Sequence, residues 1–203
     1  RTLRSSETMY YELHLTSTPQ PSSTLPRFQT TCADLGGKAV LIELPEGEHP
    51  QQPMFSAVIQ SDDYHAVRQH VQMLANRFAA QGFTIVREKI EIPADCAVRF
   101  RTTYPNEKPC YFEWHGKVRH KAEELPALRA YCSRCHAHLS RNTLRHTPDQ
   151  RFITVRHSGD YTEFVERVQK LLDDLPDSVS LIKQQFEYCV YDGNLDLDKG
   201  WTH

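Results

Sequence analysis

Two stretches of the chain decide its fold: "DDYHAVRQHVQML" at residues 62–74 and "GDYTEFVERVQKL" at residues 159–171. Both carry an Asp-Tyr pair near the start and a Val-Gln pair near the end. Their apolar residues recur with the four-, three- and four-residue spacing of one helical face. These residues are Val67, Val71, Leu74 and Phe78 in one helix and Phe164, Val168, Leu171 and Leu175 in the other. Each stretch therefore predicts an amphipathic helix that packs on a sheet.

Further matches lie on both sides of these stretches. "MFSAV" (54–58) resembles "RFITV" (151–155), and "IVREKIE" (85–91) resembles "LIKQQFE" (181–187). A Leu-Pro pair precedes a cysteine by the same distance in both halves, at Cys32 and Cys132. The offset between matching positions drifts only from 101 to 96 residues along the chain. Matches in one order at nearly one offset predict an internal duplication.

Each predicted copy contains strand, helix, strand, strand, helix and strand, in that order. The expected elements of the first copy are 10–16, 25–35, 38–45, 54–60, a helix capped by Ser61, and 83–92. Those of the second are 110–117, 123–136, a poorly marked strand, 151–157, a helix capped by Ser158, and 179–190. This is the ferredoxin-like order.

The sequence thus predicts an α+β fold of two tandem ferredoxin-like (βαββαβ) units related by internal duplication. The units span 9–93 and 110–190, with a linker at 94–109 and a polar C-terminal tail at 191–203. A single α+β domain with one larger sheet is the alternative.

The composition is that of an ordinary globular protein. Of the 203 residues, 39% are hydrophobic and 25% are charged, and no apolar run is long enough to span a bilayer. The net charge of −2 gives no general attraction to nucleic acid or to a membrane. The six cysteines are interpreted as reduced thiols, so we expect a cytoplasmic protein without a membrane partner.

A Glu-x-His pattern occurs at the same place in both predicted copies, in "YYELHLTS" (10–17) and "CYFEWHGKV" (110–118). Strand alternation puts the Glu and the His on the face that points away from the helices. The usual ferredoxin-like strand order adds alternate residues of the neighbouring fourth strand to this polar face. Its members are Tyr10, Glu12, His14, Thr16, Arg87, Lys89 and Glu91 in the first copy and Tyr111, Glu113, His115, Lys117, Lys183, Gln185 and Glu187 in the second.

Two interpretations of these faces stay open. In one, both faces are exposed to solvent and are stabilised by opposite charges on neighbouring strands. In the other, the faces enclose a polar cleft that binds a small anionic or phosphorylated ligand. In the cleft, His14 and His115 would serve as catalytic acid and base for weak phosphoester chemistry, oriented by Glu12 and Glu113. The ligand itself would be contacted by Tyr10, Thr16, Arg87, Lys89, Glu91, Tyr111, Lys117, Lys183 and Glu187.

Two families of phosphate-processing enzymes resemble parts of this pattern. His14-Leu15-Thr16 is similar to the His-x-Thr/Ser motif that two-histidine phosphoesterases carry once in each half. The matching positions of the second copy, His115-Gly116-Lys117, depart from this motif because a lysine cannot replace the hydroxyl group. "VREKIE" is similar to the charged strands of triphosphate-tunnel enzymes, whereas their Glu-x-Glu-x-Lys opening is missing from "YELHLT". Neither resemblance extends over the whole chain.

Two segments carry metal-ligand residue types, although the sequence as a whole predicts no cofactor. "YCSRCHAH" (131–138) would offer zinc the ligands Cys132, Cys135, His136 and His138. Its Cys-x-x-Cys-His pattern is also the signal for c-type haem attachment, and buried thiols are the alternative to both. The tail would offer calcium the oxygens of Asp192, Asn194, Asp196 and Asp198, without the glutamate that closes a calcium loop.

The only strongly basic window, residues 134–157, holds five arginines and four histidines against one acid, Asp149. This window supports an alternative function, a non-catalytic module that binds RNA or a protein partner. A charged edge that prevents sheet-to-sheet aggregation is the simpler interpretation.

Overall fold

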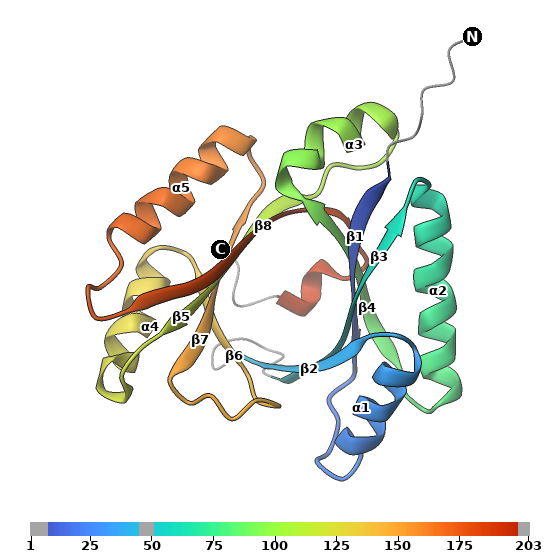
Figure 1. The fold of residues 1–203 in the computed structure, drawn as a ribbon, viewed down its shortest axis with the longest axis horizontal. Coiled ribbons are helices and arrows are strands. Elements are labelled where there is room, and N and C mark those ends of the chain that lie inside the picture. Colours follow the sequence, from blue (N-terminus) through green and yellow to red (C-terminus); the bar gives the residue numbers. More distant parts are fainter. Residues whose placement is uncertain (1–7, 45–50, 199–203) are drawn as a thin grey trace.

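The described residues form a closed antiparallel barrel with helices around it. The structure, a computed structural model, describes residues 8–44 and 51–198. The barrel order is β1-β3-β2-β6-β7-β5-β8-β4. Figure 1 looks down the barrel and shows the longer helices outside the ring of strands.

The elements have the following bounds. The strands are β1 (Met9–Ser17), β2 (Lys38–Glu43), β3 (Gln51–Ser61), β4 (Ile85–Pro93), β5 (Tyr111–Arg119), β6 (His138–Asn142), β7 (Gln150–His157) and β8 (Ser180–Asp192). The α-helices are α1 (Leu25–Asp34), α2 (Tyr64–Ala80), α3 (Ala97–Thr103), α4 (Leu125–Arg134) and α5 (Tyr161–Asp173). Three short 3-10 helices are η1 (Ala94–Cys96), η2 (Ala122–Glu124) and η3 (Leu195–Asp198).

A mixed α/β fold with an antiparallel sheet is confirmed. The strand order is β4-β1-β3-β2 in one half and β8-β5-β7-β6 in the other. The halves join where β2 pairs with β6 and where β4 pairs with β8. Both halves therefore share one sheet, which closes through the pairing of β4 with β8 and a short contact between β2 and β6.

The apolar faces that the sequence predicts for α2 and α5 are buried against the barrel. Val67, Val71, Leu74 and Phe78 are buried, as are Phe164, Val168 and Leu171. The predicted caps are wrong, because the side chains of Asp63 and Asp160 accept the backbone hydrogen bonds that start the helices. Ser61 instead accepts a hydrogen bond from the backbone N–H of Asp63.

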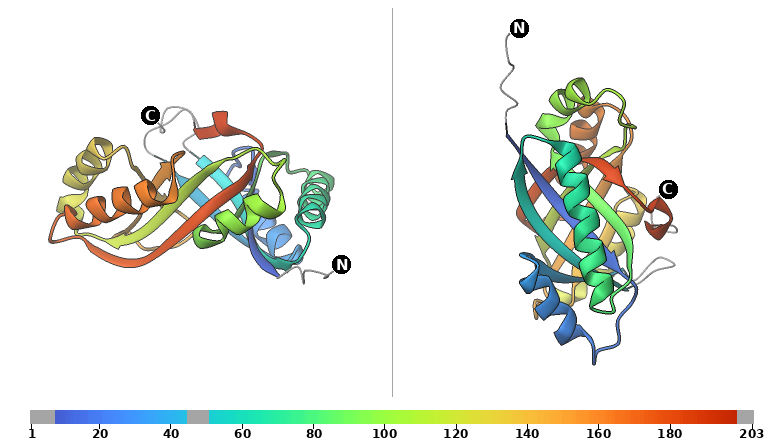
Figure 2. Two further views of the ribbon diagram at one scale, coloured as in Figure 1. Left: turned by 90° about the horizontal axis from the view of Figure 1, so that it is seen from above. Right: turned by 90° about the vertical axis from the view of Figure 1, so that its right-hand side faces the viewer.

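The predicted linker and the predicted C-terminal tail both contain helices, which the sequence did not predict. The predicted linker folds into η1 and α3, and Phe100 of α3 packs edge-on against Tyr64 at 4.9 Å between ring centroids. The predicted polar tail begins inside β8 and continues into η3, where Leu197 and Asp198 are buried. The two views agree that η3 covers one mouth of the barrel (Figures 1 and 2). Residues 199–203 lie outside the described part of the chain.

No helix in the described ranges combines the length and the apolar character needed to cross a bilayer.

Candidate functional site

The two predicted polar faces line the inside of the barrel. On β1, Leu13 and Leu15 are 0% exposed and belong to the hydrophobic core, so the alternating Glu12 and His14 point inward. The inward residues are enclosed as well, and Glu113 is only 2% exposed. The geometry therefore favours an enclosed polar site over two solvent-exposed faces.

Side chains from both halves meet inside this barrel. Lys89 Nζ lies 2.6 Å from Glu113 Oε1 of the other half and 2.5 Å from Glu91 Oε1 of its own strand. His115 Nε2 lies 2.9 Å from Glu113 Oε1, and its Nδ1 is 2.9 Å from Thr154 Oγ1. Four of the predicted site residues thus form one contiguous cluster.

The strand register corrects the expected charge pairing. Glu12 lies opposite Glu91, and Glu113 lies opposite Glu187, so carboxylate faces carboxylate in both halves. The prediction that opposite charges pair across neighbouring strands is therefore wrong at these positions. Compensation comes from the other half of the chain, because β4 and β5 both pair with β8 and Lys89 reaches Glu113 over that one intervening strand.

Asp192, Asp198 and Arg156 complete the cluster, although the sequence pattern placed the two aspartates only in a possible calcium loop and Arg156 only in the basic window. Arg87 donates hydrogen bonds to both oxygens of Asp198, at 2.8 and 2.7 Å, and to Asp192, at 3.0 and 2.5 Å. Arg156 Nη2 lies 2.7 Å from Asp198 Oδ2 and 2.9 Å from Glu113 Oε2. Strand alternation applied to β7 would have found Arg156, because it lies opposite Glu113 in the register. The sequence holds no comparable local signal for Asp198.

The environment moves the pKa values of the two histidines in opposite directions. Burial lowers the pKa of His14 and outweighs the nearby Glu91 and Glu12. Burial also acts to lower the pKa of His115, but the charge and hydrogen bond of Glu113 raise it above its usual value. Burial would raise the pKa of Glu113 itself, and the charges of Lys89 and Arg156 instead hold it well below its usual range.

Three predicted ligand-binding residues lie apart from the cluster. Tyr10 is 57% exposed at the beginning of β1. Lys183 is exposed on the first part of β8, and its register partner Lys117 is half-buried with Nζ 6.0 Å from the ring centroid of Phe152. Strand alternation predicted the correct face for these three residues. It could not predict how far each one lies from the centre of the barrel, because that depends on where its strand enters the barrel.

The predicted zinc ligands do not form a cluster. Within residues 8–44 and 51–198, three or more potential ligand atoms lie within 4.8 Å of one another only in the groups Glu12–His14–Glu187 and Glu91–His115–Glu187. Cys132, Cys135, His136 and His138 form no such group, because the chain runs from the end of α4 into β6 between them. Two of the predicted calcium ligands, Asp192 and Asp198, lie close together, but their carboxylates bind Arg87.

The basic window does not form one continuous surface. Arg156 points into the barrel cluster, and the buried Arg151 donates hydrogen bonds to the backbone carbonyls of Pro148 and Gln150. Arg141 pairs with Glu43 at 2.7 Å. The window therefore presents fewer cations to a partner than its sequence suggests.

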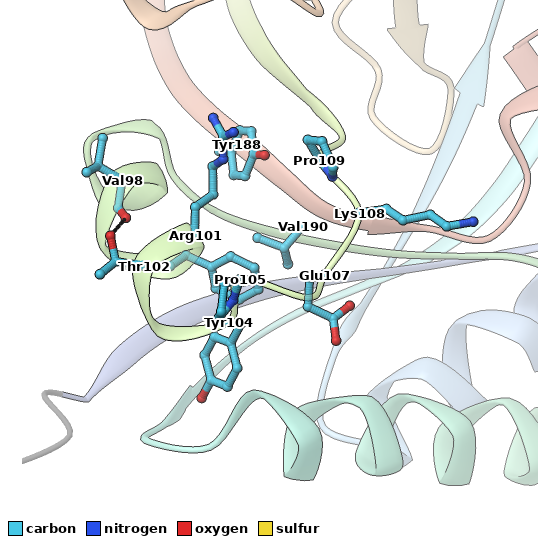
Figure 3. A pocket seen from close by; sticks show the side chains of 11 residues that line it. Val98, Arg101, Thr102, Tyr104, Pro105, Glu107, Lys108, Pro109, Tyr188 and Val190 are labelled. Atoms are coloured by element: carbon cyan, nitrogen blue, oxygen red, sulfur yellow. Dashed lines mark hydrogen bonds between the residues drawn. The ribbon is translucent and has the colours of Figure 1, made fainter.

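A separate cavity of about 340 Å³ lies outside the barrel, between α3 and β8. Figure 3 shows Tyr104, Tyr188 and Val190 around it, with the charged Arg101 and Glu107 also lining it. None of the predicted site residues lines this cavity, so it is distinct from the barrel cluster.

No protein-family model and no curated protein matches the sequence. Comparison with solved structures finds the small subunit of acetolactate synthase from Thermotoga maritima, with 10% identity, 90% of this chain and 95% of that chain covered, and a TM-score of 0.30. The regulatory subunit of aspartate kinase from Thermus thermophilus has 13% identity, coverage of 80% and 92%, and a TM-score of 0.34. Chlorite dismutase from Candidatus Nitrospira defluvii has 10% identity, coverage of 97% and 97%, and a TM-score of 0.32. We take no functional argument from likenesses this low.

Proposed function

We propose that the barrel interior binds a small anionic ligand between Arg87 and Arg156. One observation carries this proposal: two guanidinium groups from different halves converge on a single carboxylate, that of Asp198. A planar guanidinium matches the paired oxygens of a carboxylate or phosphate, and two of them create a strongly anion-selective position.

Asp198 serves as the internal occupant of this position. It is 0% exposed, yet it belongs to η3, a four-residue 3-10 helix over one mouth of the barrel. Movement of η3 would release the carboxylate, while Arg87 would keep its second partner, Asp192. An external phosphate or carboxylate group would then replace Asp198 on both arginines.

Acid–base chemistry on a phosphorylated ligand is the second part of this proposal. The environments of His14 and His115 push their pKa values apart, which favours a neutral and a protonated imidazole in one enclosed site. In the hydrolysis of such a ligand, His115 would act as the general acid and His14 as the general base.

We also propose that the barrel arose by duplication of one ferredoxin-like unit. Equivalent strand orders in the two halves support this, as do the caps Asp63 and Asp160 at the starts of α2 and α5. Gly36 and His136 add support, since both have positive φ one residue beyond the matching caps that end α1 and α4.

We place the protein in the cytoplasm, on the argument that its six cysteines suit a reducing compartment.

Calorimetric titration of pyrophosphate into the full chain tests the proposed anion site. Asp198→Asn removes the charge of the internal competitor, so we expect it to bind pyrophosphate more tightly than the wild-type protein does. Asp196→Asn, an exposed aspartate on the same 3-10 helix, is the matched control and should behave as wild type. Arg156→Met should abolish binding. Absence of binding in both the wild type and Asp198→Asn would refute the proposal.

The chemical step has its own test, the hydrolysis of a panel of phosphodiesters and nucleotides. We expect turnover by the wild type and its loss in His14→Ala and in His115→Ala. Equal rates in all three proteins would show that neither histidine takes part in the reaction.

A further inference from the structure

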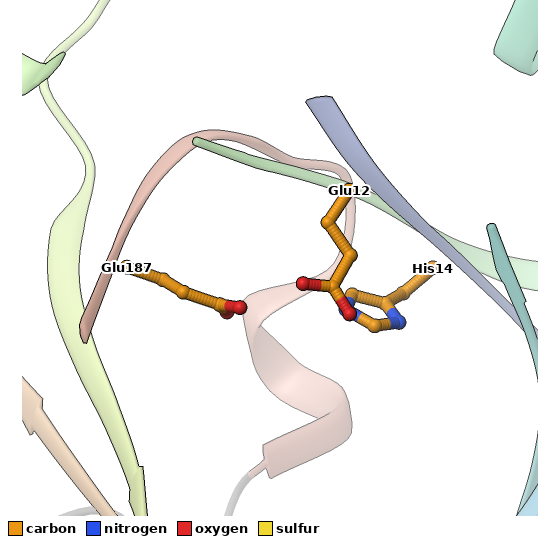
Figure 4. A group of neighbouring side chains, drawn as sticks. All are labelled: Glu12, His14 and Glu187. Atoms are coloured by element: carbon orange, nitrogen blue, oxygen red, sulfur yellow. The ribbon is translucent and has the colours of Figure 1, made fainter. Parts of the chain in front are cut away.

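We infer that Glu12, His14 and Glu187 form a binding site for one divalent metal ion. One potential ligand atom from each residue lies within 4.8 Å of those from the other two. Figure 4 shows the carboxylates of Glu12 and Glu187 directed toward each other, with the His14 ring beside Glu12. Glu12 and His14 come from β1 and Glu187 from β8, so the site joins the two halves of the barrel.

Glu187 is the residue that needs a ligand. It is 6% exposed, and within the described ranges its buried Oε2 has no hydrogen-bond partner. The closest ion-pair contact is His115 Nε2 at 3.8 Å, which is too long for a hydrogen bond. A buried carboxylate oxygen in this condition is unfavourable unless a cation approaches it.

The charge balance of the barrel interior favours an added cation. Six carboxylates, those of Glu12, Glu91, Glu113, Glu187, Asp192 and Asp198, accompany three permanent cations, Arg87, Lys89 and Arg156. Each of these cations already contacts two of the other four carboxylates. In the part of the chain that the structure describes, neither Glu12 nor Glu187 pairs with a lysine or arginine. These two glutamates therefore carry two of the three negative charges that the permanent cations leave uncompensated among the described residues.

The second group, Glu91–His115–Glu187, shares Glu187, but both nitrogens of its imidazole are already engaged. His115 Nε2 lies 2.9 Å from Glu113 Oε1, and its Nδ1 lies 2.9 Å from Thr154 Oγ1. Both oxygens of Glu91 lack a hydrogen-bond partner among the described residues, and Oε1 lies 2.5 Å from Lys89 Nζ. In the chosen group, Glu12 Oε1 and His14 Nε2 lie 3.5 Å apart, and the buried His14 Nδ1 lacks a hydrogen-bond partner in the same ranges. The chosen group is therefore the one that offers a metal ion an unengaged imidazole nitrogen.

The donor set indicates which metals fit. Two carboxylates and one imidazole suit Mn²⁺ or Zn²⁺, because hard oxygen ligands and a nitrogen ligand are combined. The side chains of Glu12 and His14 are 25% and 14% exposed, which leaves a route from solvent. Three protein ligands leave coordination positions open for water or for a ligand oxygen. In the metal-loaded protein His14 would be a metal ligand. The proposed role of His14 as a general base therefore applies only to the metal-free protein.

Binding of Mn²⁺ alone to the purified full chain tests this inference without any substrate. Free Mn²⁺ is followed by its electron paramagnetic resonance signal, and Zn²⁺ competes in a second titration. We expect one Mn²⁺ per chain, and at least about a 10-fold loss of affinity in Glu12→Gln and in Glu187→Gln. Glu163→Gln is the matched control, because Glu163 also contacts a histidine, His157, at 3.4 Å but lies on the surface. It should bind Mn²⁺ as the wild type does.

Three outcomes would overturn the inference. The first is that the wild type binds neither Mn²⁺ nor Zn²⁺ at millimolar concentration. The second is that Glu12→Gln, a substitution at a partly exposed position, keeps the wild-type affinity and the wild-type circular dichroism spectrum. The third is that Glu91→Gln alone removes binding, which would assign the metal to the other group. Because no anion is present, none of these outcomes depends on whether pyrophosphate binds.

Discussion

Replacement of Arg87 by methionine is the most direct test of the charge network inside the barrel. Arg87 is 6% exposed and engages two carboxylates in bidentate fashion, through four hydrogen bonds of 2.5–3.0 Å. Methionine keeps much of the volume and removes the charge. Asp192 then retains the hydroxyl of Tyr111 at 2.5 Å, and Asp198 retains Arg156 at 2.7 Å.

The expected cost follows from this geometry. Removal of one partner from a buried ion pair costs about 3–5 kcal/mol, because the remaining charge stays desolvated. Two carboxylates are affected here, but each keeps one other partner, so we expect about 3–5 kcal/mol in total rather than twice that. For a chain of this length each kcal/mol lowers Tm by about 2–4 °C, which predicts a fall of about 6–20 °C.

Arg119→Met is the matched control. Arg119 Nε lies 3.1 Å from Asp149 Oδ2, but the two side chains are 57% and 49% exposed. Exposed pairs contribute about 0–1 kcal/mol, so Tm should fall by no more than about 4 °C. Thermal unfolding gives Tm and urea unfolding gives the free energy of unfolding; both are measured at neutral pH by circular dichroism for the two variants.

A double variant separates charge from packing. Asp198→Asn in the Arg87→Met background removes the charge of one of the two carboxylates that lose Arg87, so the double variant should be more stable than Arg87→Met alone. The reasoning fails if Arg87→Met loses no more stability than Arg119→Met. It also fails if the second substitution restores nothing, because the loss would then come from packing.

Two further predictions concern pH and packing. Burial would raise the pKa of Asp192, but the hydrogen bonds and charge of Arg87 lower it below its ordinary value. The folded state therefore binds fewer protons than the unfolded state, so this stabilisation is complete above about pH 5 and lost toward about pH 3. Urea titrations across that range should show the loss, and Arg87→Met should show a smaller one. A Cβ at Gly116 would overlap the buried ring of Trp114. Gly116→Ala should therefore lower the free energy of unfolding in urea by about 1–3 kcal/mol and shift the tryptophan fluorescence. A loss below about 0.5 kcal/mol would contradict this prediction.

The sequence by itself determined most of the helices and strands and the face of each on which a side chain lies. The apolar spacing of α2 and α5 and the alternation along β1 and β5 repeat every few residues, so they reflect backbone geometry alone. For this reason the sequence places Glu12 and His14 on the polar face of one strand and Glu113 and His115 on the polar face of the other. The helix α3 escaped prediction because it is one short element within a stretch that matches nothing in the other half.

Tertiary structure alone decided what those faces enclose. Closure of the barrel depends on β2 meeting β6 and β4 meeting β8, and backbone hydrogen bonds between strand edges leave no pattern in the side chains. Closure also selects the ion pairs: Arg87 meets Asp198, which is 111 residues away, and Lys89 meets Glu113 over the strand β8 that lies between β4 and β5. Coulomb attraction depends on distance in space rather than on separation along the chain, so only the folded barrel determines which charges neutralise one another and which remain to attract a ligand.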